Sequence, residues 1–406
     1  MPPQKPTILQ IIPALDTGGA ELSTVEIAQA IVAGGGRALV ATTGGRLAHA
    51  ITEAGGEIIP FPAASKNPAR MMANAWALAQ LIRRENVELV HARSRAPAWS
   101  ALWAARATKR PFITTYHGAY AERSALKRAY NGVMAKGDVV IANSAFTAGL
   151  INARYGTRVE KIRIIHRGVD PDAFDPATIA PARLDAMREA LGLAAGQPMI
   201  LHAARLTRWK GQPVLIDSLA RLAQADWVAV FAGDDQGRGA YTHELERKIA
   251  ELGLTGRIRI SGHINDMAAA FALSSVVVIA STEPEAFGRT AIEAQMMGFP
   301  VIATRIGAPP ETVLAEPTVG PDRRTGWLIP PGDPAALAEA LSAALALTAA
   351  ERGALSLRAR AHAGRNFSLQ AMKFATLQVY DQMLNSRLAV TFAASQMPQF
   401  QPPSTP

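Results

Sequence analysis

Short apolar segments alternate with longer amphipathic ones along most of the chain, and this alternation predicts repeated β-α-β units. Runs of Val, Ile, Leu and Ala bounded by turn residues are typical of strands buried in a parallel sheet. In the first half we expect strands at residues 7–12, 38–43, 89–93, 112–117, 139–144 and 163–170. In the second half we expect them at residues 199–205, 227–234, 258–262, 275–281 and 300–305. The pattern therefore predicts an α/β protein with two doubly wound parallel sheets in sequence.

A proline-rich stretch separates the two series of strands. Four prolines fall within residues 168–198 among short polar side chains, and such a composition interrupts regular structure. We therefore expect a first domain over 1–178 and a second over 179–365. The segment 366–387 predicts an amphipathic helix, and 388–406, which ends in "QMPQFQPPSTP", predicts a loose tail.

The composition fits two apolar cores. A chain of 406 residues exceeds what one core usually holds, and 49% hydrophobic but only 6% aromatic residues suit helices packed on parallel sheets. The absence of cysteine excludes disulfide scaffolds, zinc–thiolate sites and thiolate nucleophiles. The chain also lacks a secretory signal and any run of the roughly 18 apolar residues that a membrane span needs. We expect a soluble, cytoplasmic protein.

Positive charge is concentrated in the first half. Residues 1–180 hold 21 Lys and Arg against 13 Asp and Glu, and the stretch from Arg83 to Lys136 holds eleven against three. This excess favours an anionic substrate, an anionic membrane surface at the inner face, or nucleic acid, although a merely solubilising surface is the plainer explanation. Nucleic acid is disfavoured because this half lacks clustered aromatics and a recognition-helix signature.

The stretch "EPEAFGRTAIEA", residues 283–294, carries the most specific chemistry. It follows an apolar strand, so it predicts a loop and then a helix that begins near Arg289. We expect the backbone N–H groups of Arg289, Thr290 and Ala291 to be unpaired at the positive helix end, where they suit a phosphate. Glu285 precedes this helix and Glu293 lies about one turn into it. Two carboxylates would repel a phosphate, so we expect each of them to bind hydroxyl groups beside it. A nucleotide sugar has hydroxyl groups on both sides of its phosphates, on the hexose and on the ribose. The alternative is that the first glutamate caps the helix and the second is an ordinary surface acid.

A second motif, "AARLTRWKG", follows the first strand of the second half. Arg205 and Lys210 are five residues apart in a strand-to-helix loop, and both side chains can converge on one anion such as a diphosphate. Arg208 between them is expected to be a bystander. Two solvated loop charges are the alternative.

Two further features lie in the first half. Gly18 and Gly19 form a turn between a strand and a helix, where backbone can approach a ligand closely. The chain has neither a G-x-G-x-x-G fingerprint nor a P-loop. His117 follows a strand at the carboxyl edge where such sheets bind ligands, although a lone histidine is often structural.

Taken together, these motifs resemble the retaining, nucleotide-sugar-dependent family 4 glycosyltransferases. The segment "EAFGRTAIEA" matches the E-x7-E signature of that family, and the other motifs follow in its order: "GGAE", "TYHG", "IANSAFTAGLI", "RGVD", "AARLTRWKG", "FAGD", "GFPVIAT" and "TGWLIPPGD". The resemblance covers residues 7–385. It implies the GT-B fold, in which two Rossmann-like domains face each other across a cleft, the first binds the acceptor, the second binds the donor, and the last helix returns to the first.

The resemblance also implies how the donor is held. Arg205 and Lys210 would neutralise the diphosphate, and the Gly18–Gly19 turn would meet the donor phosphate. The helix-start residues Arg289 and Thr290 are expected donor contacts from the motif itself, as described above. Glu293 would bind the ribose.

The transferred sugar has its own implied contacts. Glu285 would bind it, helped by the backbone N–H groups of Phe287 and Gly288, and His117 would approach it.

Three arginines depart from the family pattern. Arg167 stands before G-V-D where asparagine is common, and Arg93 and Arg95 replace part of an H-A-H motif. All three lie in the basic half. We expect them to bind an anionic glycan or glycolipid acceptor, such as a lipopolysaccharide core or a phosphorylated lipid.

The expected activity is that of a hexosyltransferase-type enzyme that retains the anomeric configuration and needs no metal or cofactor. The resemblance implies that the acceptor hydroxyl attacks the sugar from its front face. The paired aspartates of "GDDQG", residues 233–237, predict a turn and not a metal site. A sugar-nucleotide epimerase or phosphorylase on the same fold is the alternative, and a non-enzymatic nucleic-acid-binding protein is a more distant one. The base, the sugar, the acceptor and the oligomeric state stay open.

Overall fold

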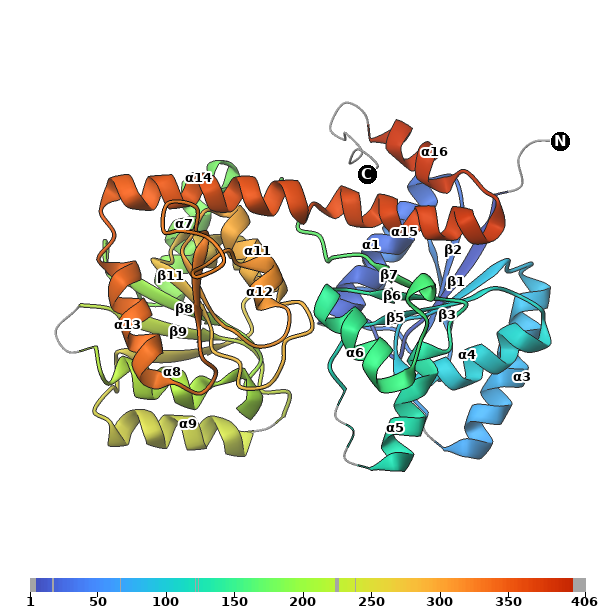
Figure 1. Ribbon diagram of the computed structural model, residues 1–406, viewed down its shortest axis with the longest axis horizontal. Coiled ribbons are helices and arrows are strands. Elements are labelled where there is room, and N and C mark those ends of the chain that lie inside the picture. Colours follow the sequence, from blue (N-terminus) through green and yellow to red (C-terminus); the bar gives the residue numbers. More distant parts are fainter. Residues whose placement is uncertain are drawn as a thin grey trace. The chain divides into compact units, whose positions relative to one another are not determined.

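The computed structural model describes residues 5–16, 18–65, 67–120, 122, 124–222, 226–237 and 239–396. The chain divides into two compact units, drawn in Figure 1. Unit 1 comprises residues 1–168 and 369–406, and unit 2 comprises residues 169–368.

The expected boundary at residue 178 falls inside unit 2. The segment just before it is bound to that unit: the Val169 amide donates to the Phe367 carbonyl at 2.8 Å, and Asp175 pairs with Arg360 at 3.0 Å. Phe174 packs on one of the unit 2 cores. Proline density located the linker approximately, but these long-range contacts decide where the unit begins.

Unit 1 contains a seven-stranded, wholly parallel sheet in the order β3-β2-β1-β4-β5-β6-β7. The strands are β1 (Thr7–Ile11), β2 (Arg37–Thr42), β3 (Glu57–Pro60), β4 (Leu89–Ala92), β5 (Phe112–Tyr116), β6 (Val139–Ala142) and β7 (Ile162–Ile164). Strand β3 was not expected from the sequence, because it is a short, partly exposed edge strand without a continuous apolar run. The strand order reverses between β1 and β4.

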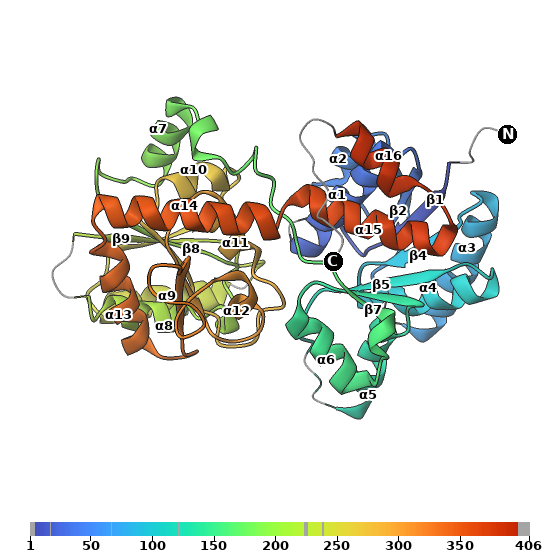
Figure 2. The ribbon, with the colours of Figure 1, turned by 45° about the horizontal axis from the view of Figure 1, so that its top comes forward.

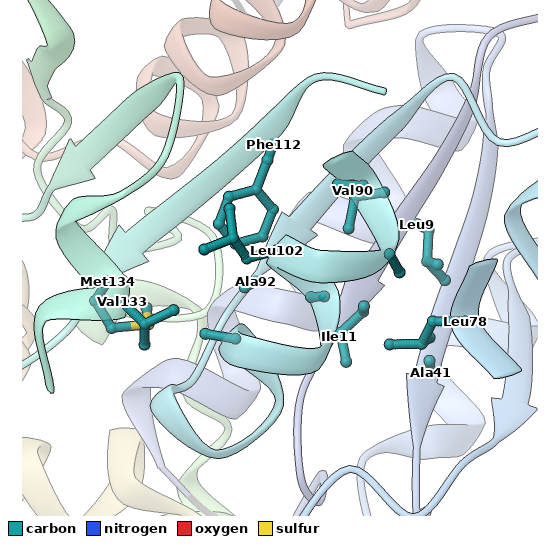
Figure 3. Packing of buried hydrophobic residues seen from close by; sticks show 14 of the residues in the cluster. Leu9, Ile11, Ala41, Leu78, Val90, Ala92, Leu102, Phe112, Val133 and Met134 are labelled. Atoms are coloured by element: carbon teal, nitrogen blue, oxygen red, sulfur yellow. The ribbon is translucent and has the colours of Figure 1, made fainter. Parts of the chain in front are cut away.

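Helices cover both faces of this sheet. They are α1 (Gly19–Ala33), α2 (Ala48–Glu53), α3 (Pro68–Arg84), α4 (Arg95–Ala107), α6 (Ala145–Tyr155), α15 (Leu369–Leu384) and α16 (Leu388–Ser395). A further helix, α5 (Ala125–Asn131), packs beside the 3-10 helix Gly132–Ala135. Alternate residues of β1 point to opposite faces, so Leu9 and Ile11 join the core under α3 and α4, while Ile8 joins the core under α1 and α15. Figure 3 shows the first of these cores, with Leu78 and Leu102 among the residues packed against the strands.

Residues 388–395 correct the expectation of a loose tail. They form helix α16, in which Leu388, Ala389 and Phe392 are buried. The Asp381 carboxylate accepts the amides of Leu388 and Ala389 at 2.7 and 2.9 Å, and so holds the start of the helix. The apolar residues of α16 are buried by packing against other helices of unit 1, so the sequence of this segment alone does not show that it is helical and packed. The rest of the predicted tail, 397–406, lies outside the described residues.

Unit 2 contains a six-stranded parallel sheet in the order β10-β9-β8-β11-β12-β13. The strands are β8 (Met199–Ala203), β9 (Val228–Ala232), β10 (Ile258–Gly262), β11 (Val276–Ile279), β12 (Val301–Thr304) and β13 (Gly326–Ile329). The edge strand β13 was not expected either, because it is only four residues long and is followed directly by proline. The strand order reverses between β8 and β11.

The sheet of unit 2 is also covered on both faces (Figure 2). One core lies under α8 (Gln212–Leu219), α9 (Gly239–Glu251) and α13 (Pro334–Leu345). The other lies under α7 (Pro181–Ala190), α10 (Met267–Ala272) and α11 (Arg289–Met296). Helix α14 (Ala349–Asn366) packs beside α11, and the short helix α12 spans Pro309–Thr312. The two sheets confirm the expected fold class.

Candidate active site

The predicted donor residues of unit 2 follow the two strands at which the strand order reverses. Arg205 and Lys210 lie in the loop after β8, and Glu285 lies in the loop after β11. In doubly wound sheets the carboxyl ends of such strands leave a crevice between their loops, where ligands bind. The topology therefore brings these motifs, some 75 residues apart in the chain, to one edge of one sheet.

Lys210 and Glu285 form a partly buried ion pair. The Lys210 Nζ lies 2.5 Å from the Glu285 Oε1, and the two side chains are only 17% and 8% exposed. The Ser281 hydroxyl donates to the same carboxylate oxygen at 2.5 Å. The lysine also lies 4.3 Å from the centre of the Trp209 ring. A cation and a carboxylate are thus both held at the sheet edge, each oriented by the other.

Two glycines allow the backbone to approach this pair. Gly211 has φ +77°, and a Cβ added there would lie 1.8 Å from the Ala280 carbonyl oxygen. Gly307 has φ +84°, and its Cβ would lie 2.3 Å from the Glu285 carbonyl oxygen, which also accepts the Ala308 amide at 2.9 Å. Other residues would be strained in both places. The loops after β8, β11 and β12 are therefore packed backbone to backbone around the ion pair.

Helix α11 presents its N-terminus at the same edge. Its N-cap is Gly288, which has φ +83° and no side chain to cap the first amides. Thr290 donates to the carbonyl of Ala203, the last residue of β8, at 3.3 Å, and Arg289 pairs with Glu293 at 3.2 Å. The expectation of an unpaired Ala291 amide is wrong, because it donates to the Gly288 carbonyl at 3.0 Å.

The three cations of the β8 loop differ in their surroundings. The Arg205 side chain is exposed, and it has no ion-pair partner within the described residues. Arg208 instead forms two hydrogen bonds to Glu244, at 2.6 and 2.5 Å. Arg208, which was expected not to bind the ligand, is therefore held in a surface ion pair, while Arg205 remains available to an anion.

Phe287 is buried and packs edge-on against Phe367, with ring centres 5.8 Å apart. This contact anchors the loop just before α11. The structure thus places Phe287, Gly288, Arg289, Thr290 and Glu293 in one continuous segment at the sheet edge.

Unit 1 has its own reversal point, between β1 and β4, and several predicted residues lie there. Gly18 is the N-cap of helix α1, which follows β1 and begins at Gly19, and Arg93 directly follows β4. Arg93 is 2% exposed and donates to the Ser23 hydroxyl at 2.7 Å. Burial lowers the pKa of Arg93 to about 10. Its Nε has no hydrogen-bond partner among the described residues, so this buried cation has unused donor capacity.

His117 and Arg167 are in contact. The Arg167 guanidinium donates to the His117 Nδ1, so this hydrogen-bond network assigns the imidazole proton to Nε2. That nitrogen is buried and without a partner in the described part of the chain. Burial, followed by the charges of Arg167 and Arg93, holds the pKa of His117 well below its usual range. The imidazole is therefore a neutral hydrogen-bond donor at pH 7.

Arg95 lies in the same neighbourhood. Its guanidinium stacks 4.0 Å from the centre of the Tyr120 ring and donates to Asn131 at 2.9 Å. Burial raises the pKa of Tyr120 to about 12, and the charges of Arg95 and Arg167 oppose that rise. The structure thus gathers the three predicted acceptor arginines around His117 and Tyr120.

Sequence reasoning missed three supporting residues. Ser281 and Gly307 hold Glu285, and Ser23 holds Arg93. Only Ser281 carried a local signal, because a hydroxyl at a strand end four residues before a loop glutamate can reach back to it.

The expected turn at 233–237 is present. The carboxylates of Asp234 and Asp235 accept the amides of Gln236 and Gly237 at 2.5 and 2.9 Å. Within the described ranges, no group of three or more His, Asp or Glu side chains is placed to hold a metal ion. No helix in that same part of the chain is both long enough and apolar enough to cross a bilayer.

Comparison with known proteins identifies the class. A family model described as Glycosyltransferase Family 4 matches residues 17–173, and one described as Glycosyl transferases group 1 matches residues 185–362. A glycosyltransferase from Rickettsia africae ESF-5, known from a crystal structure, is 35% identical with a TM-score of 0.85 and covers 94% of this chain and 100% of its own. The chain belongs to the family 4 glycosyltransferases, and its two sheets are the Rossmann-like domains of the GT-B fold.

Two other relatives extend the comparison. The D-inositol 3-phosphate glycosyltransferase of Xylanimonas cellulosilytica is 33% identical over 260 residues, which are 63% of this chain. The match spans 60% of that relative's length. The crystal structure of Anabaena HepE in complex with UDP and glucose is 24% identical, with a TM-score of 0.79, and covers 92% of this chain and 99% of its own. This last likeness supports the fold.

Proposed function

We propose that the protein transfers a hexose from a nucleoside diphosphate sugar to a hydroxyl group of an anionic acceptor, with retention at the anomeric carbon and without a metal or cofactor. The observation that carries the proposal is the cluster at the reversal point of unit 2. There an exposed arginine, a lysine–glutamate pair and the uncapped N-terminus of α11 lie at one sheet edge.

The proposed chemistry follows from charge development. Cleavage of the bond to the sugar leaves negative charge on the diphosphate, so cations and helix amides aimed there stabilise the transition state more than the ground state. Arg205 and Lys210 supply that charge. Donor binding draws Lys210 from the carboxylate to the phosphate, and Glu285 is then released to bind a sugar hydroxyl. Glu293 binds the ribose. The resemblance to retaining enzymes supports front-face attack.

The anionic acceptor is inferred from unit 1. Its reversal point gathers Arg93, Arg95 and Arg167 beside a neutral histidine donor, a set suited to phosphate or carboxylate oxygens. One relative is named for inositol 3-phosphate, a phosphorylated compound. A lipopolysaccharide core or a phosphorylated lipid is the acceptor class we propose, and either would require work at the inner face of a membrane.

The first experiment is a thermal-shift screen of nucleotide sugars, because a ligand of the folded state raises the melting temperature by mass action. The stabilising donor is then incubated with phosphorylated acceptors, and the anomeric configuration of the product is read by NMR. Transfer with retention, unchanged by EDTA, is expected. Conversion of the nucleotide sugar without an acceptor would instead establish an epimerase, and inversion would refute the proposed stereochemistry.

Acceptor recognition gives a separate prediction. Arg95→Ala and Arg93→Gln are each expected to raise the acceptor KM about tenfold or more, since a charge-assisted hydrogen bond is worth about 1.5–3 kcal/mol. The donor KM should stay unchanged. Arg106→Ala is the matched control, because Arg106 lies on the same helix as Arg95 but pairs with Asp138 on the surface. An acceptor KM that neither variant changes would contradict the anionic acceptor.

A further inference from the structure

Unit 1 also carries an open groove lined by residues other than those predicted to bind donor or acceptor. Helices α4 and α5 and the 3-10 helix Gly132–Ala135 form it, and we call it the aromatic groove. Its lining includes Trp99, Trp103, Leu126, Tyr130, Arg128 and Lys136.

The groove exposes large apolar side chains. Leu126 is 82% exposed and Trp103 is 37% exposed, and every residue of α5 from 125 to 129 is exposed. The neighbouring helix α3 adds Met72 and Trp76 on its outer face, with 62% and 69% exposure. A folded domain gains nothing from apolar side chains held in water, and a concentration of them marks a surface that contacts something else.

Cations accompany these apolar side chains. Arg128 and Lys136 line the groove, Lys127 is exposed beside Leu126, and the Lys136 Nζ lies 5.4 Å from the centre of the Trp99 ring. The nearby carboxylate of Glu122 is only 13% exposed. It accepts the Tyr155 hydroxyl and lies 3.9 Å from the guanidinium groups of both Arg128 and Arg154. The solvent-facing rim is therefore positive.

We infer that the aromatic groove and helix α5 are a docking surface for an anionic lipid bilayer. Tryptophan and tyrosine favour the membrane–water interface, and lysine and arginine near the surface are attracted to anionic lipids. A short exposed helix with leucine at its tip suits shallow insertion among the headgroups. A symmetric contact between two copies of the chain would bring Arg128 and Lys136 of one against the same cations of the other, which disfavours self-association.

This inference rests on the proposed function only in that a lipid-linked acceptor would give the docking a purpose. Binding to lipid is testable without any transfer reaction. The two ideas can therefore fail separately.

The test is co-sedimentation of the full chain with vesicles of 30% phosphatidylglycerol in phosphatidylcholine, compared with phosphatidylcholine alone. We expect the partition coefficient to be at least tenfold higher on the anionic vesicles. Leu126→Ser should lower it several-fold, and Lys127→Gln with Lys136→Gln should lower it by about fivefold for each cation at low salt. These side chains are exposed, so folding should be unaffected.

Matched controls lie elsewhere on the chain. Leu357→Ser removes a leucine of 73% exposure on α14, and Lys161→Gln removes an exposed lysine of unit 1 outside the groove. Both should bind vesicles as the unaltered protein does. Equal partition onto neutral and anionic vesicles, or no loss with Leu126→Ser, would overturn the inference. A dimer in analytical ultracentrifugation that Leu126→Ser dissociates would assign the groove to a second copy of the chain instead.

Activity separates this inference from the proposed function. On a water-soluble acceptor, Leu126→Ser should keep the unaltered rate, whereas on acceptor embedded in anionic vesicles it should lose rate in proportion to lost binding. Vesicle binding without any transfer would refute the proposed function and leave the docking surface standing.

Discussion

Replacing Lys210 with alanine is expected to lower kcat/KM for the sugar donor by about 10²- to 10³-fold, the usual loss when one preorganised donor to a developing oxyanion is removed. The residue lies at the reversal point of unit 2 and is held by Glu285 at 2.5 Å. Its charge is needed most when the diphosphate departs, so the loss should fall mainly on kcat. Steady-state kinetics with the donor found in the thermal-shift screen measure it.

Arg208→Ala is the matched control for this prediction. Arg208 lies two residues earlier on the same 3-10 turn, but its guanidinium is committed to Glu244 at the surface. Its removal should change kcat/KM by less than about threefold, as is usual for exposed ion pairs. Equal losses in the two variants would show that the turn acts only as a structural element, and the diphosphate site would then lie elsewhere.

The second large effect is expected for Glu285→Gln, with kcat reduced about 100-fold. Glutamine can still accept the Ser281 hydroxyl, but it carries no charge to hold Lys210 or to strengthen a hydrogen bond to the sugar. Loss of transition-state stabilisation should appear in kcat, with a smaller change in the donor KM. Single-turnover measurements with saturating donor separate the chemical step from binding.

Substitutions of two neighbouring residues serve as controls for the Glu285→Gln prediction. Glu283→Gln alters an exposed carboxylate in the same loop and should leave the rate unchanged. Ser281→Ala removes only the hydrogen bond that orients Glu285, so about a tenfold loss is expected, with partial recovery in Ser281→Thr. A Glu285→Gln enzyme as fast as the unaltered one would refute the role of this carboxylate in transfer.

Much of the fold could be predicted from the sequence, since buried parallel strands are short, continuous apolar runs. Such runs located β1 and β4 at the centre of unit 1 and β8 and β11 at the centre of unit 2. The edge strands β3 and β13 were missed, because each has only four residues and a proline at its end or directly after it, which favours a loop. Helix α16 escaped as well, since its apolar face has meaning only against α1 and α15.

The predicted site residues were recognisable from local features: strand-end position, glycine turns and the spacing of charges. The pairing of Lys210 with Glu285 was not, because it joins loops 75 residues apart in the chain. Gly307 holds Glu285 through backbone approach alone, and no feature of its own segment indicates that role. The buried state of Arg93 was likewise hidden, since a charged residue after a strand is ordinarily expected to face water.

The amino-acid sequence by itself determined the two parallel sheets, the strand ends at which the candidate site residues lie and the basic character of the first half, because periodicity, turn residues and charge are properties of short segments. Only the tertiary structure decided which of those segments meet. The order of the strands brings the loops after β8 and β11 together, buries Arg93 against α1 and leaves Leu126 and Trp103 in water. Proximity between distant segments depends on how the whole chain packs, and no local pattern contains that information.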